Sequence, residues 1–158
     1  MESTEQMISV LFSVWITEEG LFKRSKECML ILTNKRIALV SKTKMNLSWW
    51  RDEVDRQLKD FKRSNNTILL TDEYTPERLA RDLLDERNMN MPLKQVTRLE
   101  TEKKGWGSQL KLKFKQDNKT KVYKLAIVKS WTTYPVKDAL SFVDANWQPW
   151  INAARSYM

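Results

Sequence analysis

The chain has 158 residues and a formal net charge of +8 at pH 7. Apolar residues make up 41% of it and charged residues 30%, which is typical of one globular domain, residues 1–158, with its own core. There is no histidine and only one cysteine, Cys28, which excludes an internal disulfide and any Ser-His or Cys-His dyad. The basic charge favours an anionic partner or surface. A single cysteine fits a reducing compartment, so we expect a cytoplasmic protein.

The first forty residues predict three strands. β-branched and aromatic side chains dominate residues 7–17, which indicates a first strand. This apolar run is too short to span a bilayer. Apolar runs at 28–32 and 36–40 predict a hairpin, with Asn34 in the turn because asparagine tolerates a left-handed conformation. The near-continuous apolar character of both runs predicts that both faces of these strands are covered.

Residues 46–90 predict a helical insertion. Apolar side chains recur at helical spacing along its first part: Trp50, Val54, Leu58 and Phe61. Ser48 is the expected N-cap of this helix. A second helix is expected to begin at Thr75 and Pro76, as N-cap and first helical residue, with an apolar face made of Leu79, Ala80, Leu83 and Leu84. The apolar run between the helices, residues 67–71, is a candidate strand.

The C-terminal part predicts strands followed by a helix. Residues 96–103 indicate a strand, and Gly105-Trp106-Gly107 a turn into a hairpin. Residues 116–119 form the expected turn of that hairpin, because Asp and Asn accept positive φ. A last helix is expected from Pro135 on, with one apolar stripe: Val136, Ala139, Leu140, Val143, Trp147, Trp150, Ile151 and Ala154. Pro149 falls inside this stripe and predicts a kink or a two-piece helix.

The hairpin segment, residues 103–129, contains the whole excess charge of the protein. It has nine lysines and one acid, a difference equal to the net charge of +8 of the chain. Within it, Lys111, Lys113 and Lys115 alternate with Leu110, Leu112 and Phe114, which predicts a strand with one wet face and one buried face.

The motifs resemble those of a known family. The segment from Leu30 to Val40, L-I-L-T-N-K-R-I-A-L-V, looks like the L-x-L-T-N-x-R-L hairpin of GRAM and prokaryotic pleckstrin-homology-like domains. Met91-Pro-Leu-Lys-Gln-Val96, with Leu99 and Glu100 after it, resembles their I-P-x-x-x-I-x-x-V step. Gly107-Ser-x-Leu-Lys-Leu112 resembles the next strand, and Thr75-Pro-Glu-Arg-Leu79 the short helix before the proline.

This resemblance implies an α+β fold. The expected fold is a strongly bent antiparallel sheet of about seven strands, a partly open barrel capped by a C-terminal amphipathic helix, with the helical insertion 46–90 in its middle. The sequence departs from the family at residues 46–66. Some prokaryotic members have an apolar Gly/Ala-rich insertion there, whereas this chain has a charged amphipathic helix with Trp49 and Trp50. The role of that insertion is therefore not transferred.

The lysine face is the first candidate site. Basic side chains near an anionic membrane each contribute about 1 kcal/mol, and Trp106, between two glycines in the turn into the hairpin, is a candidate exposed anchor. The candidate residues for an anionic ligand or membrane in this segment are Lys103, Lys104, Trp106, Lys111, Lys113 and Lys115. The alternative is a solvated strand face whose lysines protect a sheet edge.

The first inter-strand loop is the second candidate site. It contains Lys23, Arg24 and Lys26, and the resemblance implies a place for inositol phosphates there. Lipid-binding members also use basic residues on the first strand, which this chain lacks, and Glu18-Glu19 would repel a headgroup.

We expect a non-catalytic binding or adaptor domain that engages a protein partner or an anionic membrane surface, without cofactor or metal. One alternative is nonspecific nucleic-acid binding through residues 103–129 and Trp106. Another is an interaction or oligomerisation module that uses the helix 48–63, with Trp49 pointing away from the core. Cys28 is expected to be a buried, inert thiol. The oligomeric state and the identity of the partner stay open.

Overall fold

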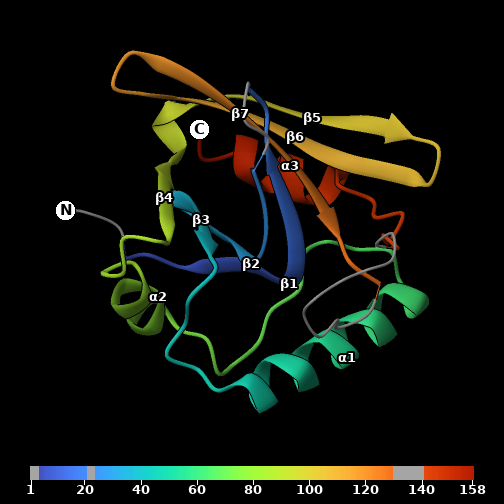
Figure 1. Cartoon of the computed structure of the whole chain (residues 1–158). Coiled ribbons are helices and arrows are strands. Elements are labelled where there is room, and N and C mark those ends of the chain that lie inside the picture. Colours follow the sequence, from blue (N-terminus) through green and yellow to red (C-terminus); the bar gives the residue numbers. More distant parts are fainter. Residues whose placement is uncertain (1–3, 21–23, 130–140) are drawn as a thin grey trace.

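Seven antiparallel strands form one sheet. The computed structural model describes residues 4–20, 24–129 and 141–158. The order of the strands is β4-β3-β2-β1-β7-β6-β5, and the sheet is not closed, since β4 and β5 are its two edges (Figure 1). The strands are β1 (Met7–Glu18), β2 (Arg24–Thr33), β3 (Arg36–Val40), β4 (Met89–Pro92), β5 (Val96–Lys104), β6 (Gly107–Gln116) and β7 (Lys119–Ile127).

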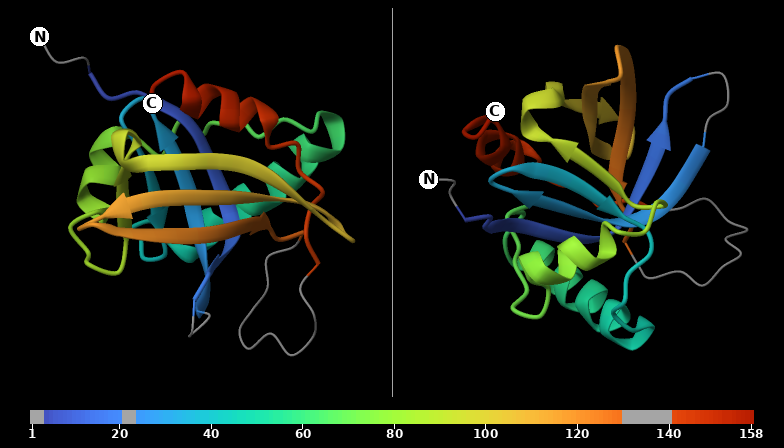
Figure 2. Two further views of the ribbon diagram at one scale, coloured as in Figure 1. Left: turned by 90° about the horizontal axis from the view of Figure 1, so that it is seen from above. Right: turned by 90° about the vertical axis from the view of Figure 1, so that its left-hand side faces the viewer.

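Helices complete an α+β fold, which confirms the predicted class. Two of them, α1 (Leu47–Arg63) and α2 (Pro76–Asp82), lie between β3 and β4 in the chain, where the helical insertion was expected. A short 3-10 helix, η1 (Leu93–Gln95), joins β4 to β5, and α3 (Gln148–Arg155) lies near the C-terminus. Figure 2 shows α1 and α2 on one side of β1–β3 and α3 on the other.

The two faces of the sheet bury separate apolar clusters. The larger cluster draws on all seven strands and on α3, and includes Leu30 of β2 and Trp150 of α3. The smaller one lies between β1–β3 and the helices α1 and α2, and includes Ile31 of β2 and Val54 of α1. Consecutive residues of β2 thus enter opposite clusters, which confirms that this strand is covered on both faces.

A polar contact fixes α1 to an irregular point of β1. The pairing of β1 with β2 shifts between Leu11 and Val14, and Ser13 has a φ of 52°. The buried Gln57 of α1 accepts a hydrogen bond from the Phe12 N–H at 2.7 Å and donates one to the Phe12 carbonyl at 2.9 Å. A helix side chain therefore takes the place of a neighbouring strand at this residue.

Several sequence predictions about local structure are confirmed. Thr75 caps α2 through its side chain, with Pro76 in the first turn. The turn of the basic hairpin has positive φ at both central residues, 52° at Asp117 and 62° at Asn118. These values, in a two-residue loop between β6 and β7, define a type I′ turn.

The last helix is shorter than predicted. It begins at Gln148, so Pro149 lies in its first turn, where its missing N–H has no helical partner to lose. The predicted kink is therefore wrong, and residues 141–147 form no other helical piece. The preceding residues are extended: the Val143 N–H donates to the Ile127 carbonyl at 2.7 Å, and the Lys129 N–H donates to the Ser141 carbonyl at 2.8 Å. The predicted start at Pro135 lies outside the described residues.

Three finer predictions about the insertion are also wrong. Asn46, not Ser48, caps α1, because its side chain accepts from the Trp49 N–H at 2.8 Å. Residues 67–71 form no strand, but they contact β1 through hydrogen bonds from the Val10 N–H to the Leu69 carbonyl and from the Ser9 hydroxyl to the Thr67 carbonyl. Of the apolar face predicted for the second helix, Leu79 is buried, but Ala80 is exposed, and so is Leu84 in the turn that follows α2.

Candidate functional site

The outer face of β6 carries the lysines in the alternation that the sequence predicts. Leu110, Leu112 and Phe114 are buried in the larger cluster. Lys111, Lys113 and Lys115 alternate with them and lie on the opposite face, partly or fully exposed. The wet face of this strand is therefore basic, as expected.

One carboxylate organises the middle of this face. Glu102 of β5 lies 3.1 Å from the Lys104 Nζ, 3.4 Å from the Lys124 Nζ and 3.8 Å from the Lys111 Nζ. Gln109 donates a further hydrogen bond to it at 2.9 Å. The hydrogen bond from Lys104, assisted by Lys124, lowers the pKa of Glu102 despite partial desolvation. Lys104, Lys111 and Lys124 thus belong to a shared ion network rather than to a free basic patch.

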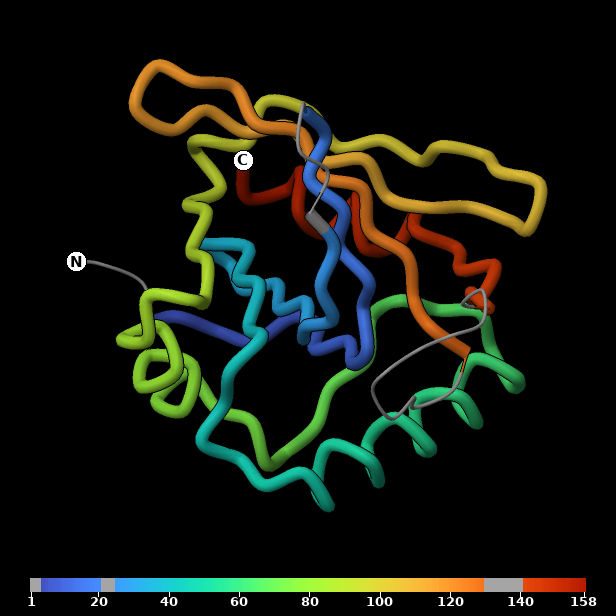
Figure 3. Tube along the Cα trace, in the orientation of Figure 1, coloured from blue at the N-terminus to red at the C-terminus, as the bar shows by residue number. Residues whose placement is uncertain are grey.

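The distal end of the β6–β7 hairpin is different. We call residues 113–122 the hairpin tip. β7 pairs with β1 only from Tyr123 onward, and β5 pairs with β6 only as far as Phe114. The last rungs of the hairpin, up to the pair Gln116–Lys119, have no other strand beside them in the described part of the chain. The end of the tip, residues 115–120, therefore projects from the sheet, at the upper left of Figure 3, whereas Lys113 is still opposite Arg98 of β5.

Four lysines cover both faces of the hairpin tip. Lys113 and Lys115 lie on the outer face, whereas Lys121 is opposite Phe114 and Lys119 is opposite Gln116. The structure records no ion pair for any of the four among the residues it describes. Asp117 is the one acid of the tip. Lys119 and Lys121 were missed as site residues, although their places beside a two-residue turn were visible in the sequence.

Trp106 does not join the lysines of the tip. It lies in the turn between β5 and β6, at the other end of β6, about nine residues or roughly 30 Å from Lys115 at the usual strand rise. It is 37% exposed, and its ring packs on Phe142 with centroids 5.0 Å apart. Lys103 is exposed near the same end, opposite Ser108. Trp106 therefore lies apart from Lys113 and Lys115.

The basic loop after β1 is described only in part. Lys23 and the side chain of Arg24 lie outside the described residues. Lys26 donates from its Nζ to the Arg87 carbonyl at 3.1 Å. This contact joins the start of β2 to the segment that follows α2.

The tryptophans are mostly core residues. Trp49 is 8% exposed and packs edge-on against Phe12 at 5.2 Å and stacked with Tyr74 at 6.1 Å. The expectation that Trp49 points away from the core is therefore wrong, and no exposed ring is left there for a partner. Trp147 and Trp150 are buried, as predicted.

Cys28 is buried in β2, and desolvation raises the pKa of its thiol well above the usual value. A thiol in this environment stays protonated and inert. The two acidic residues of β5 both lie near cations, Glu102 near its lysines and Glu100 4.0 Å from Arg98. No group of potential metal ligands is found among the residues that the structure describes.

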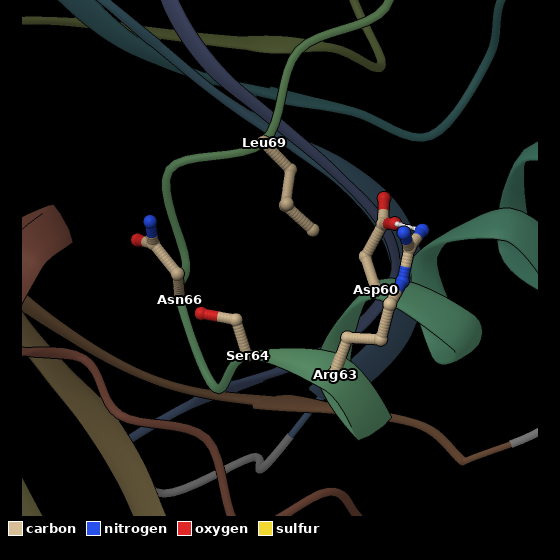
Figure 4. A pocket seen from close by; sticks show the side chains of 5 residues that line it. All are labelled: Asp60, Arg63, Ser64, Asn66 and Leu69. Atoms are coloured by element: carbon tan, nitrogen blue, oxygen red, sulfur yellow. Dashed lines mark hydrogen bonds and ion pairs between the residues drawn. The ribbon is translucent and has the colours of Figure 1, made fainter.

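A small pocket at the C-terminal end of α1 has a nearly balanced charge. It measures about 330 Å³ and is lined by Asp60, Arg63, Ser64, Asn66 and Leu69 (Figure 4). Its one basic side chain, Arg63, forms an ion pair with Asp60 at 3.0 Å. The pocket therefore does not extend the basic surface.

Comparison with protein-family models, with curated proteins and with solved structures finds no match to this chain. In the described ranges, no helix is both long enough and apolar enough to cross a membrane.

Proposed function

We propose that the chain is a non-catalytic binding domain of the pleckstrin-homology-like superfold. The sequence motifs support this assignment, and so does the order of elements: three strands, a helical insertion, four strands and a terminal helix. In this proposal the bent sheet is a partly open barrel and α3 caps it. Fold alone does not select a ligand, so the partner is inferred from the surface.

The partner that the surface favours is an anionic membrane. The observation that supports a membrane partner is the hairpin tip, whose end projects from the sheet. Its four lysines have no ion pair in the described part of the chain. Lysines on both faces suit end-on contact with an extended charged surface better than binding in a groove. At about 1 kcal/mol per basic residue, with Asp117 opposing one of them, the tip would contribute about 3 kcal/mol, or roughly a hundredfold in affinity.

Nucleic-acid binding is the weaker alternative. Sequence-independent binding of single strands combines basic grooves with aromatic side chains on which bases stack. Here Trp106 lies at the opposite end of β6 from the tip, and its ring is partly covered by Phe142. The tip also contains no arginine, the side chain best suited to bidentate contacts with bases.

A cytoplasmic, peripheral location completes the proposal. Anionic lipids give the cytoplasmic leaflet its negative surface potential, and a basic domain at that leaflet would bind reversibly. Binding should weaken as salt increases, since exposed charges are screened beyond a Debye length of about 10 Å at 0.1 M.

Vesicle flotation tests this function. We expect wild-type protein to float with vesicles that contain phosphatidylserine at low salt, and not with neutral phosphatidylcholine vesicles. The double variant Lys115→Glu/Lys119→Glu should lose about tenfold or more in vesicle affinity. The matched control is Lys59→Glu/Lys62→Glu, the same charge change at exposed lysines of α1, which should bind like wild type.

Two vesicle results would contradict the proposal: no flotation with acidic vesicles at low salt, or equal losses of vesicle affinity in the two double variants. A filter assay in which wild type retains nucleic acid, and only the tip variant fails to retain it, would also contradict the proposal. The last result would support the nucleic-acid alternative.

A further inference from the structure

A second basic site lies between the loop after β3 and the end of α2. It is a cleft of about 500 Å³ whose lining residues are Lys42, Thr43, Lys44, Arg81, Asp82, Leu84, Asp85 and Arg87. Four of these side chains are basic and two are acidic. None of these residues belongs to the hairpin tip.

Buried polar contacts hold the two walls of the cleft together. Asp82, 3% exposed, accepts hydrogen bonds from the Thr43 hydroxyl at 2.7 Å, the Lys44 N–H at 3.0 Å and the Tyr74 hydroxyl at 2.6 Å. Asn88 accepts from the Lys42 N–H at 2.9 Å and donates to the Lys42 carbonyl at 2.6 Å. The loop backbone is thus fixed and its polar groups are occupied, so recognition in the cleft would depend on side chains.

The two acidic side chains of the cleft already have hydrogen-bond partners, whereas three of its basic side chains have none in the described part of the chain. Arg87 holds Asp85 through Nε at 3.0 Å and a second nitrogen at 2.6 Å, and these bonds lower the pKa of Asp85 well below its usual range. Within the described ranges, Lys42, Lys44 and Arg81 are exposed and form no side-chain hydrogen bond or ion pair. The available charge of the cleft is therefore positive.

An apolar side chain stands beside these charges. Leu84 is 83% exposed, the highest value among the large apolar residues that the structure describes. It lies in the turn that follows α2 and lines the cleft. Isolated exposed leucines are common, but this one borders a cleft with a positive rim.

We infer that this cleft binds a short acidic peptide segment of a partner protein, with its carboxylates on Lys42, Lys44 and Arg81 and an apolar side chain against Leu84. Lys42 and Lys44 follow β3, whereas Arg81 belongs to α2, so these cations come from two separate walls of the cleft, which suits several separate carboxylates. A single phosphate would need converging donors, and the guanidinium of Arg87 is already engaged with Asp85. The site is separate from the hairpin tip, so the domain could hold a peptide while it rests on a membrane.

Fluorescence anisotropy with labelled peptides tests this inference. The probe is a short peptide of alternating glutamate and leucine, and two control peptides replace either the glutamates by glutamine or the leucines by serine. We expect wild-type protein to bind the probe more tightly than both controls. Lys42→Glu/Lys44→Glu and Arg81→Glu should each weaken binding by about tenfold, and Leu84→Ser should remove the preference for leucine over serine.

The hairpin-tip variant Lys115→Glu/Lys119→Glu serves as the matched control and should bind the probe like wild type. Urea unfolding of every variant checks that the fold is intact, and Lys42→Gln/Lys44→Gln replaces the charge reversal if that variant unfolds. The inference is overturned if no peptide binds, if the tip and cleft variants lose probe affinity equally, or if the serine peptide binds wild type as well as the probe does. It is also overturned if the cleft variants lose acidic-vesicle binding only, which would make the cleft part of the membrane surface.

Discussion

Gln57 joins α1 to β1 through both polar atoms of its side-chain amide. It is 3% exposed, and it satisfies the N–H and the carbonyl of Phe12 where β1 departs from regular pairing. Trp50 adds a hydrogen bond from its Nε1 to the Ser13 hydroxyl at 3.2 Å. No periodicity in the sequence marks this contact, since a glutamine between Arg56 and Leu58 of an amphipathic helix has no distinguishing pattern.

Gln57→Leu should therefore destabilise the protein strongly. Two buried backbone groups would lose their partners, and each unsatisfied group costs about 1–3 kcal/mol, so we expect a loss of about 2–4 kcal/mol in the free energy of unfolding. Urea denaturation measures it. Asp55→Ala, at an exposed position of the same helix, should change stability by less than about 0.5 kcal/mol. Equal effects in the two variants would show that the Gln57 bridge contributes nothing.

Glu27 should make the stability of the folded protein depend on pH. It is half-buried on β2 opposite Trp15, and desolvation raises the pKa of its carboxyl above the ordinary 4.5, against the opposing hydrogen bond with Ser13. The folded state thus binds the proton more tightly than the unfolded chain does. Stability contributed by this group is present below the unfolded pKa and falls as the pH rises through the folded pKa.

Glu27→Gln should accordingly stabilise the protein near neutral pH, because it removes a charge that is partly desolvated. The gain should shrink below about pH 4, where both states of the wild-type carboxyl are protonated. Paired urea titrations of wild type and variant at several pH values measure it. A gain that stays constant with pH, or a loss near neutral pH, would contradict this explanation.

At the scale of elements, the turn between β5 and β6 packs tightly against the extended segment before α3. A Cβ added to Gly107 would lie 2.6 Å from the Asp144 Cβ, and Gly107 has a φ of 145°. Gly105, in the same turn, has open space where its Cβ would be. The two glycines that flank Trp106 look equivalent in the sequence, yet only one of them needs to be glycine.

Gly107→Ala should destabilise the protein by about 1–3 kcal/mol through overpacking and backbone strain. Gly105→Ala, two residues away, should stay within about 0.5 kcal/mol of wild type. Thermal or urea unfolding of both variants makes the comparison. If Gly107→Ala is as stable as Gly105→Ala, the turn does not dock against Asp144 as described.

Prediction of the elements from sequence succeeded where local chemistry decides the structure. The hairpin turn at Asp117-Asn118 and the cap at Thr75 depend on a few adjacent residues, and both were predicted. It failed for the last helix, because Val143 and Trp147 happen to fit the helical spacing of Trp150 and Ala154. The backbone of Val143 instead pairs with that of Ile127, a tertiary contact that overrides the pattern.

At the scale of the whole molecule, charge and fold must be combined to locate a binding surface. The sequence placed all the excess charge in residues 103–129, and the lysine alternation on β6 was predicted. The sequence did not reveal which lysines of this segment form ion pairs and which do not. The Glu102 carboxylate lies within ion-pair distance of Lys111 and Lys124 only because β5, β6 and β7 are neighbours in the sheet. The pairing of strands thus gives Lys104, Lys111 and Lys124 a shared carboxylate partner, whereas the four lysines of the hairpin tip have no ion pair among the described residues.

The basic cleft, too, could not be predicted from the sequence. Lys42 and Lys44 follow β3, whereas Arg81 and Leu84 come from the end of α2. The buried Asp82 and Asn88 bring these distant segments together. A single sequence contains no local pattern that would reveal this pairing.

The most direct test of membrane docking places a reporter on the hairpin tip. Cys28 is 0% exposed, so an environment-sensitive fluorophore can be attached selectively to Thr120→Cys on the tip or to Ser48→Cys on α1, both exposed positions. On addition of phosphatidylserine vesicles, we expect the emission at residue 120 to shift to shorter wavelength, with reversal at high salt, and the emission at residue 48 to stay unchanged. The account would be contradicted if the emission at residue 120 did not change while the protein bound the vesicles. Equal emission shifts at both positions would contradict it as well.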